Sequence, residues 1–164
     1  MTKAHRYYLN IGSNIRPEIN LLKTIDLLRA YGKVQAVSNA WESHAIGDDG
    51  PNFLNACVIF LSLLEADELK VNTIGTIEAS LGRVRTSDKN APRTIDIDII
   101  MVDDKPFNID RWTNAFVVVP MSELAPDLEH PIEHQRLVQV AERMIAHTWL
   151  RMRPEILEQR VGDY

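Results

Sequence analysis

Apolar residues recur along this chain with two different spacings, and each spacing predicts a different kind of element. In 17–32, Leu21, Ile25 and Leu28 lie three or four positions apart, which places them on one face of a helix. A proline opens this stretch and a glycine closes it, as is common at helix starts and ends. The sequence therefore predicts a helix over 17–32.

Helical spacing returns in two later stretches, 67–82 and 134–150. The first of these ends on a glycine, a common helix stop. We expect the inward faces to consist of Val71, Ile74, Ile77 and Leu81 in the first and of Leu137, Val140, Ala141 and Met144 in the second.

Strands are predicted where apolar residues alternate with polar ones or form short runs bounded by turn residues. These stretches are 6–12, 33–42, 52–63 and 92–100, with a further short strand at 115–120. Together with the first two helices, the first four strands produce the order βαββαβ. The predicted fold class is α+β: a ferredoxin-like βαββαβ sandwich whose mainly antiparallel sheet has helices packed on one face, within one domain over 1–164.

The strand PRTIDIDII at 92–100 contains two aspartates, although aspartate is depleted in strands. Successive side chains of a strand alternate between faces, so Asp96 and Asp98 share one face. Two interpretations remain open: the carboxylates belong to a solvated edge strand, or they lie in a cleft and hold Mg²⁺ together with substrate phosphates. The opposite face is expected to carry Arg93, Ile95, Ile97 and Ile99.

The polar stretch LGRVRTSDKNAPR before this strand is predicted to be a loop with four cations, Arg83, Arg85, Lys89 and Arg93. Arginine forks bind phosphate oxygens, and arginine with Mg²⁺ is the usual equipment for moving a phosphoryl group. The alternative is an ordinary solvated charge run. The chain has neither a G-x-x-x-x-G-K-[ST] loop nor a G-x-G-x-x-G turn, so a nucleotide would have to be held by side chains and metal.

Composition restricts the partners of this chain. A formal charge of −5 over 164 residues disfavours a nucleic-acid surface, which requires a broad basic face. Neither a signal peptide nor an apolar run of about 18 residues occurs, so we expect a cytoplasmic protein without membrane contact. The lone Cys57 lies in an apolar run and is expected in the core. We expect a monomer.

Phe53 and Asn55 lie two positions apart in a predicted strand and therefore share a face. An aromatic ring and an amide on one face can stack on and hydrogen-bond a flat heterocycle, although a phenylalanine at a strand end is also a common core residue. His130 and His134 lack an evident third ligand, so we expect surface histidines rather than a zinc site.

The segments LNIGSN, GPNFLNA, IEASLGRVR and PRTIDIDII, followed more weakly by FVVVPMSELAPDLEHP, occur in this order within residues 7–131. They resemble the 6-hydroxymethyl-7,8-dihydropterin pyrophosphokinase (HPPK) family, which transfers pyrophosphate from ATP to a pterin hydroxymethyl group in folate biosynthesis. The resemblance implies a ferredoxin-like fold, in agreement with the predicted element order.

Position by position, the resemblance implies that Asp96 and Asp98 ligate two Mg²⁺ ions bridging the ATP phosphates. It implies Arg83 and Arg93 as catalytic residues near the transferred group. For ATP it implies Glu78 and Arg85, to which we add the cations Lys89 and Arg111. The residues expected to hold the dihydropterin are Ser43, Phe53, Asn55 and Phe116.

The chain departs from the family between the D-x-D strand and Phe116. The family carries a Pro-His motif and a following arginine there, whereas 105–115 is too short to contain them. We expect Arg111 to replace part of the lost phosphate binding. Trp112 is expected either to cover a ligand ring or to fill the gap left by the shorter loop. The shortening also leaves an alternative function open, that of a non-catalytic or altered-specificity paralogue that binds pterin or nucleotide.

Overall fold

The fold was obtained as a computed structural model, which describes residues 3–45, 50–84, 87 and 93–163. Eight strands of the described residues form one antiparallel sheet in the order β6-β5-β1-β4-β2-β8, with β3 beside β4 and β7 beside β3. The strands are β1 His5–Ser13, β2 Lys33–Val37, β3 Ala40–Ser43, β4 Phe53–Ser62, β5 Asp96–Val102, β6 Lys105–Pro106, β7 Leu150–Arg153 and β8 Gly162–Asp163.

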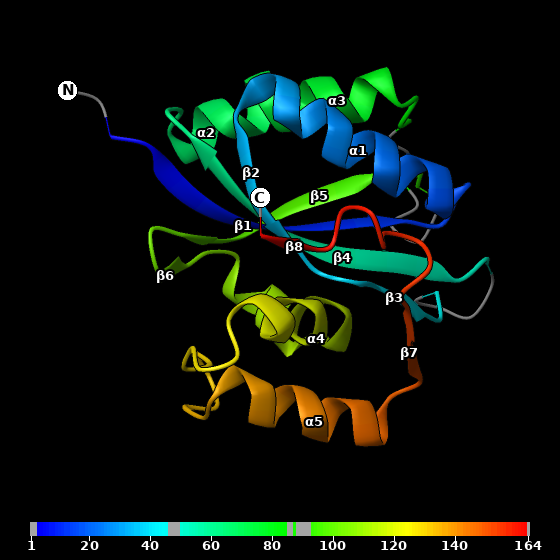
Figure 1. Ribbon diagram of the computed structural model, residues 1–164, viewed down its shortest axis with the longest axis vertical. Coiled ribbons are helices and arrows are strands. Elements are labelled where there is room, and N and C mark those ends of the chain that lie inside the picture. The colour runs from blue at the N-terminus through cyan, green and yellow to red at the C-terminus, as the bar shows by residue number, and fades with distance from the viewer. Residues whose placement is uncertain (1–2, 46–49, 85–86, 88–92, 164) are drawn as a thin grey trace.

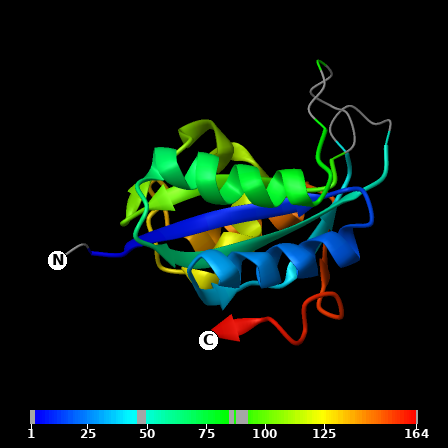
Figure 2. The ribbon, with the colours of Figure 1, turned by 90° about the horizontal axis from the view of Figure 1, so that it is seen from above.

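Helices cover both faces of this sheet (Figure 1). They are α1 Pro17–Tyr31, α2 Ala66–Leu69, the π-helical turn η1 Lys70–Ile74, α3 Gly75–Ser80, the 3₁₀-helix η2 Ile109–Thr113, α4 Ala115–Leu124 and α5 Leu137–His147. Figure 2 shows α1 and the helix formed by α2, η1 and α3 lying side by side over one face. The βαββαβ order of the first five strands and two helices, with β2 and β3 as one interrupted strand, confirms the ferredoxin-like fold class.

The prediction of helices on only one face is wrong, because the central strands are apolar on both. One face of the sheet packs Leu9, Val58 and Ile97 against α1 and α3. The other buries Tyr8 and Ile100, among others, with Val118 of α4, and α5 packs in turn on α4. The two aspartates of β5 lie on this second face, at the beginning of the strand.

The predicted strand at 115–120 is a second error, since these residues begin α4. Its valine-rich run has strand propensity, but Val117, Val118 and Val119 are all buried between the sheet and α5. A short sequence that is apolar at every position can form either a buried helix or a buried strand, and tertiary packing decides which of the two forms.

Two smaller predictions also differ from the structure. The strand expected over 33–42 is broken where the Ser38 hydroxyl accepts the backbone N–H of Cys57 at 2.8 Å, so side-chain hydrogen bonding interrupts the ladder. Val71, expected on an inward face, is 69% exposed, while Leu69 is buried. The π turn at Lys70–Ile74 adds a residue to the helix and so shifts the face that meets the sheet.

The helix predicted over 134–150 exists as α5, and Leu137, Val140 and Ala141 are buried as expected. None of the helices in the described ranges has the length and apolarity needed to cross a membrane. Cys57 is fully buried, as predicted for a core thiol, and burial raises its pKa well above the usual range.

Candidate active site

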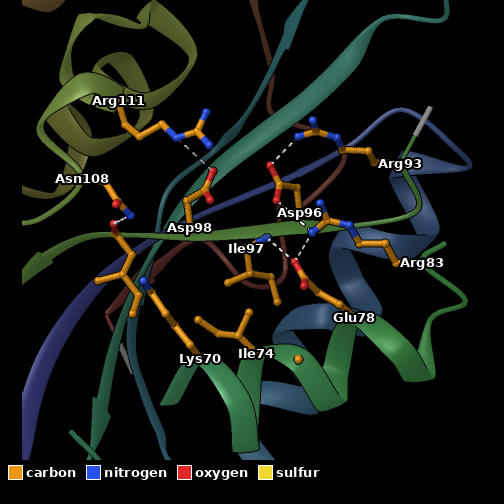
Figure 3. Close-up of a pocket in the computed structure, with 12 residues that line it drawn as sticks. Lys70, Ile74, Glu78, Arg83, Arg93, Asp96, Ile97, Asp98, Asn108 and Arg111 are labelled. Atoms are coloured by element: carbon orange, nitrogen blue, oxygen red, sulfur yellow. Dashed lines mark hydrogen bonds and ion pairs between the residues drawn. The ribbon is translucent and has the colours of Figure 1, made fainter. Parts of the chain in front are cut away.

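Asp96 and Asp98 lie at the beginning of β5 and point to the same side of the sheet, as predicted (Figure 3). Their side chains are 19% and 22% exposed, so they line a cleft and do not project from a solvated edge. On the neighbouring β1, Gly12 is opposite Asp96 and Asn10 is opposite Asp98. Gly12 has no side chain, which leaves room on this part of the sheet.

Two arginines neutralise Asp96. Arg83 Nη1 donates to Asp96 Oδ1 at 3.0 Å, and Arg93 Nη1 donates to Oδ2 at 2.9 Å. Arg93 was predicted on the apolar face of the strand, but β5 begins only at Asp96, so strand alternation does not hold at Arg93. Both predicted catalytic arginines thus meet the predicted metal ligand.

Glu78, predicted on the nucleotide side, is a buried residue of α3. Its Oε2 accepts two hydrogen bonds, one from Arg83 Nη1 at 2.5 Å and one from the backbone N–H of Ile97 at 3.0 Å. Gly82 has a φ of +81°, a left-handed conformation that glycine adopts without strain, and it ends the helix just before Arg83. Glu78 therefore fixes Arg83 against the outer edge of β5.

Asp98 has less compensating charge than Asp96. Among the described residues, Asp98 pairs with Arg111, whose Nε lies 3.8 Å from Asp98 Oδ2. Burial, followed by the negative charge of Asp96, raises the pKa of Asp98 to about 6, against the opposing effect of Arg111. A buried carboxylate in this condition favours the approach of a further cation.

The donor set fits a magnesium ion that arrives with phosphate. Two carboxylates on one face suit Mg²⁺, which prefers oxygen ligands and takes the remainder from phosphates and water. Within the described residues, no group of three or more His, Cys, Asp or Glu side chains could hold a metal, which disfavours a site built only from protein ligands.

These residues line a pocket of about 410 Å³ between β5, η2 and the α2–η1–α3 helix. The pocket contains Glu78, Arg83, Arg93, Asp96, Asp98 and Arg111, and also Lys70, Ile74 and Asn108, which sequence reasoning missed. No pattern in the sequence pointed to Lys70 or Asn108, because each reaches the pocket only through the packing of its segment. Arg85 and Lys89 lie outside the described residues.

Asn14 is a further residue without a predicted role, although it belongs to the motif LNIGSN. Its Oδ1 accepts the backbone N–H of Arg93 at 2.7 Å, and its own backbone N–H donates to Arg93 O at 3.1 Å. Asn14 thus anchors the backbone of Arg93 beside the end of β1.

None of the four predicted pterin residues lines this pocket. Asn55 pairs with Gly12, which pairs in turn with Asp96 of the pocket. Ser43 on β3 pairs with Phe53 on β4, and Phe53 shares a face with Asn55, as predicted. Phe116 lies in the first turn of α4 over this face. Ser43 and Asn55 are buried, whereas Phe53 and Phe116 are half-buried.

The shortened segment folds around Trp112, which is fully buried. Its Nε1 donates to Ile100 O at 3.2 Å and to Phe107 O at 3.3 Å, so Trp112 fills the gap and does not cover a ligand. His130 is also buried, contrary to prediction, and its Nε2 lies 2.7 Å from Trp112 O. This packing leaves the adjacent Arg111 directed at Asp98 (Figure 3).

The cluster of paired carboxylates and arginines is typical of enzymes that transfer phosphate-containing groups, whereas the ferredoxin-like fold by itself implies no function. The chain matches the sequence model of the 7,8-dihydro-6-hydroxymethylpterin-pyrophosphokinase (HPPK) family over residues 8–126. It therefore belongs to the HPPK family, and the family predicted from the motifs is confirmed.

Individual relatives support the same assignment. The 2-amino-4-hydroxy-6-hydroxymethyldihydropteridine pyrophosphokinase of Synechocystis sp. is 31% identical over 153 residues, covering 87% of this chain and 77% of that enzyme. The enzyme of the same name from Aquifex aeolicus is 33% identical over 143 residues, covering 79% of this chain and 86% of its own.

The crystal structure of wild-type Plasmodium falciparum HPPK-DHPS with pteroate superimposes with a TM-score of 0.67. The superposition covers 89% of this chain and 43% of that chain, so this chain spans less than half of the longer protein. At 12% identity this likeness shows the fold alone.

Proposed function

We propose that this chain transfers pyrophosphate from ATP to 6-hydroxymethyl-7,8-dihydropterin, the step of folate biosynthesis for which the HPPK family is named, at the beginning of β5. The observation that carries the proposal is the convergence of two carboxylates, Asp96 and Asp98, with the arginines that line the same pocket. Membership of the family supplies the reaction, and the pocket supplies the residue types that the reaction needs.

The phosphates of ATP are proposed to bind at Asp96 and Asp98 through two Mg²⁺ ions. When bound, the metal neutralises phosphate charge, which side chains alone would do incompletely. Arg83 and Arg93, which neutralise Asp96 in the structure, would then turn to the transferred group. Arg111 would contact the phosphates beside Asp98, and Glu78 would hold Arg83 in position, with Arg85 and Lys89 as further nucleotide contacts.

The dihydropterin is proposed to lie next to this pocket, between the rings of Phe53 and Phe116. Both rings are half-buried, as expected of side chains that stack on a flat ligand. Asn55 and Ser43 would hydrogen-bond the edge of the heterocycle. Bound in this way, the hydroxymethyl group would face Asp96 across the bare Gly12, which pairs with both Asp96 and Asn55.

The reaction needs no protein nucleophile. The pterin hydroxyl oxygen attacks the β-phosphorus of ATP and its proton passes to solvent. The new O–P bond forms as the bond between the β-phosphorus and the oxygen bridging to the α-phosphorus breaks, and AMP leaves with that oxygen. The protein contributes position and charge: Arg83 and Arg93 stabilise the negative charge on the group in transfer. We further propose that the chain acts as a cytoplasmic monomer and a single domain, without a nucleic-acid or membrane partner.

An AMP-release assay with ATP, Mg²⁺ and 6-hydroxymethyl-7,8-dihydropterin tests this function. We expect release that requires all three components, is abolished in Asp98→Asn, and is unchanged in Asp104→Asn, a matched charge removal at an exposed turn residue. If calorimetry detected binding of both ligands but no AMP appeared, the chain would be the non-catalytic paralogue that the shortened 105–115 segment left open.

A further inference from the structure

A proline inside α4 leaves one backbone carbonyl without its usual partner. Pro120 has no N–H and cannot donate to the carbonyl four residues earlier, that of Phe116. Asn10, a buried residue of β1, donates from Nδ2 to Phe116 O at 3.0 Å. A side chain from the sheet thus supplies a hydrogen bond that the helix cannot make.

This bond determines how two amides are oriented. A carbonyl oxygen only accepts, so Asn10 must direct its NH₂ group at Phe116 and its Oδ1 the other way. Asn10 Oδ1 accepts Asn55 Nδ2 at 2.9 Å. The Phe116 carbonyl therefore settles the orientation of Asn55 as well as that of Asn10.

Asn55 is held closely from a second side. A Cβ on Gly12 would lie 2.4 Å from Asn55 Nδ2, so the amide fits only because position 12 is glycine. Among the described residues, the side chain of Asn55 makes its hydrogen bond through Nδ2, and its Oδ1 is not one of the buried atoms that lack a partner, so this oxygen is open to solvent. The Asn55 amide therefore has two groups left to offer a ligand, its oxygen and its second N–H. Both are held in place by the hydrogen bonds of Asn10 and Asn55, which are almost fully buried.

We propose that Asn10 is a positioning residue that presets Asn55 and Phe116 for the ligand, so that Asn55 turns its amide oxygen to an N–H donor on the edge of a flat heterocycle. The inference rests on the proposed function, because that function places the dihydropterin between Asn55 and Phe116. It also predicts specificity. A heterocycle that carries a lone pair in place of that N–H would place an acceptor against the acceptor oxygen of Asn55, and it should be rejected.

The first test measures hydrogen exchange of the Asn55 side-chain NH₂ by NMR in the wild-type protein, with the signal assigned by its loss in Asn55→Ala. We expect exchange about tenfold slower than at the exposed side chain of Asn72, and loss of this protection in Asn10→Ala. An Asn55 amide that exchanges as fast as Asn72 in the wild-type protein would overturn the proposal without any ligand.

The second test is calorimetry of 6-hydroxymethyl-7,8-dihydropterin with Mg²⁺ and a non-hydrolysable ATP analogue present. Asn10→Ala should weaken pterin binding about tenfold and leave the affinity for the analogue unchanged. Asn20→Ala is the matched control, since it also removes a buried amide that donates to a backbone carbonyl, Ile15 O at 2.6 Å, but from α1 on the other face of the sheet. Asn20→Ala should leave pterin affinity unchanged.

Equal pterin affinity in wild type and Asn10→Ala, or an equal loss in the two alanine variants, would refute the positioning role. If the wild-type protein bound no dihydropterin, the proposed function would fail. The exchange measurement would still show whether Asn10 holds the Asn55 amide in place. Failure of the positioning role and failure of the proposed function are therefore distinguishable.

Discussion

Arg93 donates from Nη1 to Oδ2 of Asp96 at 2.9 Å, so the carboxylate proposed to bind metal is already neutralised by the protein. Arg83 occupies the other oxygen of the same carboxylate. If Mg²⁺ and phosphate bind as proposed, the guanidinium groups of Arg83 and Arg93 would leave Asp96 and become available to phosphate oxygens. The carboxylates hold the arginines close to where the reaction would need them.

Arg83→Ala and Arg93→Ala should differ in stability. The side chains of Arg83 and Glu78 are only 9% and 6% exposed, so loss of Arg83 removes one partner of a buried ion pair, at a cost of about 3–5 kcal/mol. Arg93 is 30% exposed, and its loss should cost less than about 1 kcal/mol. Urea unfolding of the two variants measures the difference, and equal losses would contradict this account.

The same two arginines should have similar effects on catalysis. Each is proposed to stabilise charge that develops as the phosphoryl group moves, so its removal should lower kcat by about 10²-fold and change the pterin KM much less. Steady-state AMP release by the folded fraction of each variant provides the comparison. A rise in KM with unchanged kcat would show that these residues only bind substrate.

Asp98→Asn should stabilise the protein at neutral pH while abolishing activity. The pKa of Asp98 is raised from 3.8 to about 6, so the folded protein binds this proton more tightly than the unfolded chain does. The stability contributed by Asp98 is therefore highest below its unfolded pKa, falls as the pH rises from about 4 to about 6, and stays low above that range.

Because asparagine does not ionise, the variant should lack this decline and gain about 1–3 kcal/mol over wild type above pH ~7. Urea unfolding without divalent metal, on both sides of the pH window, measures the gain. Asp104→Asn serves as the exposed control. A variant with the same pH dependence as wild type would show that Asp98 is not the group responsible.

Arg111→Ala should weaken ATP binding by about 1.5–3 kcal/mol and leave pterin affinity nearly unchanged. In the part of the chain that the structure describes, Arg111 is the cation paired with Asp98, at 3.8 Å, and it lines the pocket. Calorimetry at fixed Mg²⁺ measures both affinities. Arg136→Ala, which breaks an exposed ion pair with Asp127 outside the pocket, is the control, and unaltered ATP affinity in Arg111→Ala would falsify the assignment.

His130→Asn should destabilise the protein by about 2–3 kcal/mol. The ring donates from Nε2 to Trp112 O at 2.7 Å, and its Nδ1 accepts the backbone N–H groups of Ile132 at 3.2 Å and Glu133 at 3.1 Å. His134→Asn, at a residue whose side chain is 72% exposed, should change stability by less than about 0.5 kcal/mol. Thermal unfolding distinguishes the two, and equal shifts would rule out a special role for His130.

Predictions from the sequence were accurate where regular local spacing decides, as in the first helix. The spacing of Leu21, Ile25 and Leu28 defined α1, and the glycine after Tyr31 marked its end. Predictions failed where a distant segment decides. The run at 115–120 folds as a helix because the sheet and α5 enclose it, and His130 is buried because Trp112 accepts its hydrogen bond.

The sequence by itself determined the family, the βαββαβ order and the shared face of Asp96 and Asp98, because motif order and strand alternation are properties of neighbouring residues. Only the tertiary structure decided which arginines meet Asp96, that helices cover both faces of the sheet, and that Asn10 orients Asn55. Hydrogen-bond geometry between side chains depends on the relative placement of strands and helices, and Asn10 and Phe116 are 106 positions apart in the chain. No local pattern encodes such a contact, since it exists only after β1 and α4 have packed together.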